Sequence, residues 1–146
     1  MIDRSYIGRK FPPYIVEVEK GQLRLFAKSV SEGDPLYTNE GAAIALGCAS
    51  LPAPPTFGFS LSLAKPDMFE IFEKMGINLG KLLHGEQQFE YFAPICAGDT
   101  ITLQDEVVDI YDKQPSGLEF IVLKTTLINQ NEKKVCEMTN TLVVRN

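Results

Sequence analysis

The pattern of apolar and polar residues changes near residue 82 and divides the chain into a helical part and a strand part. In residues 21–30, Leu23, Phe26, Ala27 and Val30 have the i, i+3, i+4, i+7 spacing of one helix face. Beyond residue 82, long segments have the composition of strands, separated by turn residues. These segments are residues 86–92, 101–111, 118–128 and 134–144. Helices followed by strands are typical of an α+β protein rather than of an alternating α/β protein.

The helical part contains further boundaries. Residues 38–47 read TNEGAAIALG, which offers Thr38 or Asn39 as an N-cap and Gly47 as a C-terminal stop. Residues 53–64 are apolar or small and carry no charge, so we expect a helix there that is buried on all sides. A second helical piece is expected after Pro66, and residues 14–18 (YIVEV) suit a short opening strand.

The strand part predicts one antiparallel sheet. Gly98-Asp99, residues 115–117 and residues 129–131 supply turns at hairpin spacing, which favours a long meander. In the last strand Cys136 and Met138 face one way, while Glu137 and Thr139 face the other. We therefore expect a single domain, residues 1–146, in which an antiparallel sheet wraps around one central buried helix.

Composition and charge exclude several classes of function. The net charge of −5 argues against a nucleic-acid binder and against binding to anionic membranes. No apolar run approaches the ~20 residues that span a bilayer, and residues 1–13 lack the apolar stretch of a secretory signal. Cys48, Cys96 and Cys136 are scattered, and the chain has one histidine, so we expect no metal site and a reducing, cytoplasmic compartment. No cofactor is expected.

Candidate chemistry lies in residues 31–37, which read SEGDPLY, and in the one histidine. Glu32, Asp34 and Tyr37 share this short segment, although an acidic residue before proline is also a common turn former. His84 is the one side chain whose unperturbed pKa lies near neutral pH. It is either a base or a hydrogen-bonded histidine at the start of a strand.

Several segments, taken together and in order, resemble the hotdog domain of MaoC-like dehydratases and (R)-specific enoyl-CoA hydratases, in its N-terminal type. The most specific combination is APPTF (residues 53–57), followed by HGEQ (residues 84–87) and the proline and Gly-Asp of residues 94–99. IGRKFPP, GAAIALG and the closing hairpin also match, so the resemblance covers nearly the whole chain. It implies an α+β hotdog fold.

The resemblance also implies reversible loss of water from a 3-hydroxyacyl thioester. Catalytic members carry a D-x-N-P-x-H segment, in which Asp and His supply the acid–base pair. Here Glu32 stands in place of the Asp, Asp34 in place of the Asn, and Tyr37 in place of the His. A tyrosine side chain with a pKa near ~10 is a poor base at pH 7. The resemblance therefore implies a degenerate segment, with Glu32, Asp34, Tyr37 and His84 as the remaining catalytic candidates.

The implied substrate is an acyl thioester of coenzyme A or of an acyl carrier protein, bound by a homodimer or by a heterodimer with a catalytic hotdog subunit. The residues expected to line its pocket are Pro54, Pro55, Thr56, Phe57 and Gly58. Two alternatives remain open. One is a self-sufficient homodimeric dehydratase or thioesterase that uses His84 with Asp34 or Glu32. The other is a non-enzymatic acyl-thioester binder.

Overall fold

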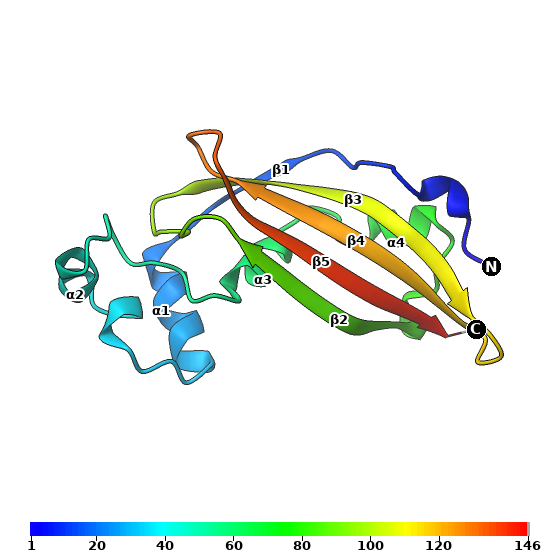
Figure 1. Cartoon of the computed structure of the whole chain (residues 1–146), viewed down its shortest axis with the longest axis horizontal. Helices are drawn as coiled ribbons and strands as arrows, with labels where there is room; N and C mark the ends of the chain where they lie inside the picture. Colours follow the sequence, from blue (N-terminus) through cyan, green and yellow to red (C-terminus); the bar gives the residue numbers. More distant parts are fainter. Residues whose placement is uncertain (146) are drawn as a thin grey trace.

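Five strands form one antiparallel sheet in the computed structural model, which describes residues 1–145 (Figure 1). The strands are β1 (Tyr14–Glu17), β2 (Leu82–Tyr91), β3 (Thr100–Lys113), β4 (Leu118–Ile128) and β5 (Lys134–Arg145). The α-helices are α1 (Lys20–Ser29), α2 (Glu40–Ala45), α3 (Phe57–Ser62) and α4 (Glu70–Lys74). Short 3₁₀ turns are η1 (Arg4–Tyr6), η2 (Pro35–Tyr37) and η3 (Leu79–Lys81).

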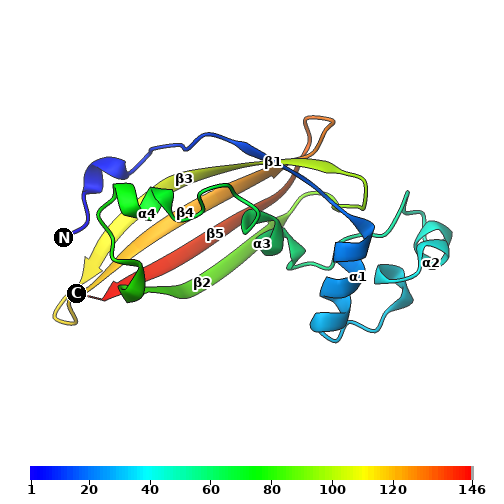
Figure 2. The ribbon, with the colours of Figure 1, turned by 180° about the vertical axis from the view of Figure 1, so that it is seen from behind.

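The helices occupy two regions relative to the sheet. Helices α3 and α4 cover one face of the sheet, which we call the inner face (Figure 2). Helices α1 and α2 lie beyond one end of the sheet, and both chain termini lie at the other end (Figures 1 and 2). Asn39 caps α2 as the sequence predicts, since its side-chain oxygen accepts a hydrogen bond from the Ala42 N–H at 3.0 Å.

The strand order is β1-β3-β4-β5-β2, so the predicted meander is confirmed for β3, β4 and β5 and is wrong for β2. Strand β2 pairs with β5, and residues 92–99 carry the chain across the end of the sheet to β3. The hairpin expected at Gly98-Asp99 is therefore a turn within this crossover. The Ala53 N–H donates to the Ile95 carbonyl at 2.7 Å and the Ala97 N–H donates to the Leu51 carbonyl at 2.8 Å, which holds the crossover in place.

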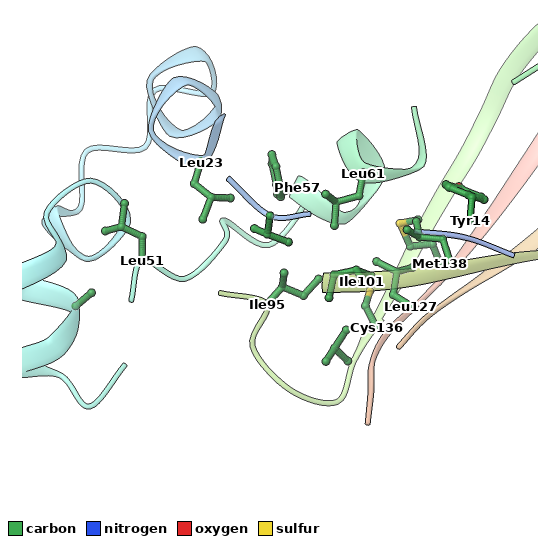
Figure 3. Close-up of a cluster of buried hydrophobic side chains, with 14 residues drawn as sticks. Tyr14, Leu23, Leu51, Phe57, Leu61, Ile95, Ile101, Leu127, Cys136 and Met138 are labelled. Atoms are coloured by element: carbon green, nitrogen blue, oxygen red, sulfur yellow. The ribbon is translucent and has the colours of Figure 1, made fainter. Parts of the chain in front are cut away.

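The core consists of two clusters of buried side chains on the inner face. The first lies beneath α3 and includes Phe57 and Leu61 of that helix together with Leu127 and Met138 of the sheet (Figure 3). The second lies beneath α4 and includes Ile71 and Phe72 from that helix. The alternation of β3 supplies both clusters, because every second residue from Ile101 to Val107 is buried.

The central helix α3 is shorter than the apolar stretch that predicted it. It contains six residues, of which Phe57, Gly58 and Leu61 are buried. Leu63, directly after the helix, is 51% exposed, so burial on all sides is wrong for this part of the stretch. A six-residue helix makes fewer than two turns, and only the sides that face the sheet and Phe26 of α1 are covered.

We expect Phe57→Ala to lower the free energy of unfolding by about 3–5 kcal/mol, because it removes a buried ring that the short helix cannot replace. Phe57 is 3% exposed and packs edge to face on Phe26, with ring centroids 5.3 Å apart. Denaturant unfolding measures the change. The matched control is Phe69→Ala, at a ring that is 47% exposed. Equal stability losses in the two variants would contradict a central role for α3.

Candidate functional site

The segment Ser31–Tyr37 forms a tight turn between α1 and α2. Asp34 is the N-cap of η2, and its Oδ1 accepts a hydrogen bond from the Leu36 N–H at 2.9 Å. The Glu32 Oε1 in turn accepts from the Asp34 N–H at 3.0 Å. Both carboxylates therefore stabilise the turn itself, which is the ordinary role of acidic residues before proline. Tyr37 ends the turn and is half-buried.

His84 lies elsewhere in the molecule. It is the third residue of β2, opposite Leu142 of β5, and its ring contacts Phe59 edge to face at 5.4 Å between centroids. It lies seven positions before Tyr91, or about 23 Å along a strand. The Tyr91 end of β2 is the end nearest α1 and α2 (Figure 1). Within one chain the structure therefore does not bring His84 into contact with Glu32 or Asp34.

A cavity of about 420 Å³, here called the outer cavity, opens at the start of α3. Pro54, Pro55 and Gly58 line it on the helix side. Tyr91, Phe92 and Cys136 line it on the sheet side. The Tyr91 hydroxyl donates a hydrogen bond to the Pro55 carbonyl at 2.8 Å, which joins the two walls.

The five predicted pocket residues thus divide into two groups. Three of them, Pro54, Pro55 and Gly58, line the outer cavity. Phe57 points into the first core cluster, and Thr56 is the exposed N-cap of α3. Burial raises the pKa of the Cys136 thiol to about 11, so at neutral pH the sheet-side wall is uncharged there.

A second cavity of about 210 Å³, here called the inner cavity, lies at the other end of α3, over the inner face of the sheet. Phe59 and Leu63 line it from the helix side, and His84, Asn140 and Leu142 line it from the sheet. It is smaller than the outer cavity and has more polar side chains around it.

Sequence reasoning missed a buried ionic group at the wall of the inner cavity. The Lys65 Nζ lies 2.8 Å from the Asp105 Oδ2, and the Thr125 hydroxyl donates to the Asp105 Oδ1 at 2.7 Å. Burial, together with the Asp105 charge, raises the pKa of the neighbouring Tyr14. The signal in the sequence was Asp105 itself, which occupies an inward strand position between Leu103 and Val107.

Within residues 1–145, no three His, Cys, Asp or Glu side chains come together as they would to hold a metal ion. No helix in this range is long and apolar enough to cross a bilayer. The cavities that a ligand could enter include the pair at the two ends of α3 and a third of about 640 Å³ between α1 and α3, which Phe26 and Phe57 help to line. The walls of all three are mainly apolar.

Comparison with known proteins gives consistent results. Residues 5–138 match the family described as "FAS1-like, dehydratase domain region". A UPF0336 protein of Saccharopolyspora erythraea is 33% identical over 145 residues, which span 99% of this chain and 92% of the relative.

Two solved structures are also similar. One is the HadBC (3R-hydroxyacyl-ACP dehydratase) complex from Mycobacterium tuberculosis, with a TM-score of 0.80 and 27% identity over 94% of this chain and 96% of that chain. The other is a MaoC-like dehydratase, with a TM-score of 0.85 and 25% identity over 97% of this chain and 43% of that chain.

We expect Lys65→Met to lower the free energy of unfolding by about 3–5 kcal/mol, because it leaves the Asp105 carboxylate buried without its counter-charge. The Lys65 and Asp105 side chains are 15% and 12% exposed, so solvent compensates little. Thermal unfolding measures the effect, and adding Asp105→Asn to the variant should restore part of the loss.

The control is Lys74→Met, which breaks a solvent-exposed ion pair with Glu70 one helical turn away. This variant should unfold at nearly the native temperature. If Lys65→Met were as mild as the control, the Asp105 charge would not depend on Lys65.

Proposed function

Because the chain belongs to the FAS1-like, dehydratase domain region family and has the hotdog fold of MaoC-like dehydratases, we propose that it binds the acyl thioester in a two-subunit enzyme. The reaction is dehydration of a 3-hydroxyacyl thioester, or the reverse hydration of an enoyl thioester. In this proposal a catalytic hotdog partner supplies the acid–base pair, and this chain supplies walls of the acyl pocket.

The observation that carries the proposal is the state of residues 31–37. Dehydration requires a base that removes the proton alpha to the carbonyl and an acid that protonates the departing hydroxyl. Such groups must lie within about 2.6–3.2 Å of the protons they move. Glu32 and Asp34 already accept hydrogen bonds from the backbone of their own turn, and Tyr37 stands where catalytic members carry the histidine. In this proposal the segment keeps the place of the catalytic turn and lacks its Asp/His pair.

The outer cavity supports acyl binding. Its lining is largely apolar, from Pro54 and Pro55 to Phe92, and its volume of about 420 Å³ lies in the range of ordinary small-molecule sites. It opens beside the turn that begins α3, which is where the resemblance puts the thioester. Acyl thioesters of coenzyme A and of a carrier protein both suit this lining, because neither wall distinguishes between the two carriers.

A partner is supported by the free edge of the sheet. Strand β2 pairs with β5 on one side, and the structure of residues 1–145 contains no strand on the other side. Leu83, Tyr91 and Phe92, in or next to this ten-residue strand, are 44–52% exposed. A long, partly apolar edge is a ready site for pairing with another strand. The similar HadBC structure is a complex of dehydratase subunits, and we propose the same kind of assembly for this chain.

The catalytic prediction is that the chain alone hydrates trans-2-enoyl thioesters little or not at all. Tyr37→His alone should not give hydration activity, because the side chain of Glu32 has one methylene more than Asp and places its carboxyl group too far out. The double change Glu32→Asp with Tyr37→His is the smallest edit expected to give measurable hydration. Loss of the enoyl absorbance measures the rate.

His84→Ala is the control for the rival enzyme. If the native chain is active, and if His84→Ala removes that activity while the protein stays folded, a self-sufficient homodimer replaces the present proposal. If a co-expressed hotdog subunit with an intact Asp/His pair gains no activity from this chain, the chain is a binder rather than an enzyme component.

The assembly prediction is that the purified chain, or its complex, sediments as a dimer or larger species at micromolar concentration. Leu83→Asp should shift it toward the monomer, because the charge lies on the β2 edge. Ile15→Asp is the matched control, since Ile15 is 68% exposed on β1 at the opposite edge of the sheet. A native monomer, or equal effects of the two variants, would argue against pairing through β2.

A further inference from the structure

The outer and inner cavities lie along the same two strands beneath α3. The inward-facing pairs between β2 and β5 run in order from one cavity to the other. They are Tyr91 with Cys136, Phe89 with Met138, Gln87 with Asn140, and His84 with Leu142. The first pair lines the outer cavity, and the last pair lines the inner cavity. A bulge between His84 and Glu86 lets His84 and Gln87 share the inner face although they are three residues apart.

The barrier between the cavities is one pair of side chains, Phe89 and Met138, with α3 above it. A Cβ added to Gly58 would lie 3.4 Å from the Met138 Sδ, so the helix passes directly over this methionine. Methionine is unbranched and readily changes its conformation. Met138 is buried and lines neither cavity, so an acyl chain in the outer cavity would reach the inner cavity only if Met138 rotated.

The next pair beyond this barrier consists of two amide side chains, Gln87 and Asn140, directly beside the apolar pair of Phe89 and Met138. The Gln87 Oε1 and the Asn140 Oδ1 are buried, and neither accepts a hydrogen bond from residues 1–145. Their neighbours along the inner face are Phe89, Met138 and Leu142. Asn140 lines the inner cavity, and Gln87 lies beside it on β2 without lining the cavity itself. A buried acceptor without a donor destabilises the fold, so this pair at the cavity wall suggests an occupant that donates.

The far wall of the inner cavity offers donors. Lys65 carries three N–H groups, of which the Asp105 carboxylate needs one, and His84 also lines the cavity. A hydroxyl group both donates and accepts, so it can donate a hydrogen bond to an amide oxygen and accept one from Lys65 or His84. A plain hydrocarbon can do neither.

We infer that the inner cavity binds the distal part of an acyl chain that carries a hydroxyl group, with Asn140 at the cavity wall and the adjacent Gln87 as the residues that recognise it. This inference rests on the proposed function. Helix α3 is about 9 Å long, so a hydroxyl at its far end is not the hydroxyl that the dehydration removes near the thioester. The substrate class is thus medium or longer acyl thioesters with a second, distal hydroxyl.

The test is calorimetric binding of matched acyl-CoA probes to the purified chain in its native assembly. One series has plain saturated medium chains, and the other has the same chains with a terminal hydroxyl. We expect the hydroxylated probe of suitable length to bind at least about tenfold more tightly. Asn140→Leu should remove this preference, and Gln87→Met should reduce it. Thr139→Val, on the outer face of β5, is the control that should retain it.

The melting temperature gives a second test. It should fall on substitution if the amide pair is merely structural, and should not fall if the two oxygens lack donors. If the two oxygens lack donors in the free protein, Asn140→Leu or Gln87→Met should keep or raise the melting temperature. A clear fall in both variants would show that the amides satisfy each other or bind water, and would overturn the inference. Tight binding of plain chains without a preference would also overturn it, whereas failure of both probes to bind would overturn the proposed function as well.

Discussion

The packing of α3 onto the inner face of the sheet is the interaction on which the other features depend. Phe57 and Leu61 belong to the first core cluster together with Leu127 and Met138, and the Phe57 ring packs on Phe26 of α1, which fixes the position of a helix of only six residues. The chain entering the helix then forms one wall of the outer cavity. The chain leaving it carries Lys65 to Asp105. Both cavities and the buried ion pair are therefore consequences of one small apolar contact.

Much of the fold could be predicted because the strands are long. Strands β3, β4 and β5 are each longer than ten residues, and much of each follows the period-two alternation that indicates a strand and its inward face. Interruptions such as the bulge after Val107 do not hide this pattern. The place of β2 could not be predicted, because Gly98-Asp99 makes the same local turn in a hairpin and in a crossover. Only the pairing of β2 with β5, which is a tertiary contact, distinguishes the two.

The parts of the site held by interactions between nearby residues could be predicted, and the parts held by interactions between distant residues could not. The turn at residues 31–37 is held by hydrogen bonds between residues two apart, and the sequence identified its acidic residues as turn formers as well as catalytic candidates. Lys65 and Asp105 are 40 residues apart, and nothing in either local pattern pairs them. The polar pair of Gln87 and Asn140 likewise depends on a strand register that includes a bulge.

The position of the turn at residues 31–37 has an evolutionary consequence. Glu32, Asp34 and Tyr37 belong to neither buried cluster, and the turn lies beyond the end of the sheet. Exchanges at these positions therefore leave the packing of α3 and the sheet intact. After a gene duplication, one copy of such a domain could drift at the turn while purifying selection on folding and on the cavity walls continued. The architecture thus separates the capacity to do chemistry from the capacity to fold, which allows two copies to diverge into unequal partners.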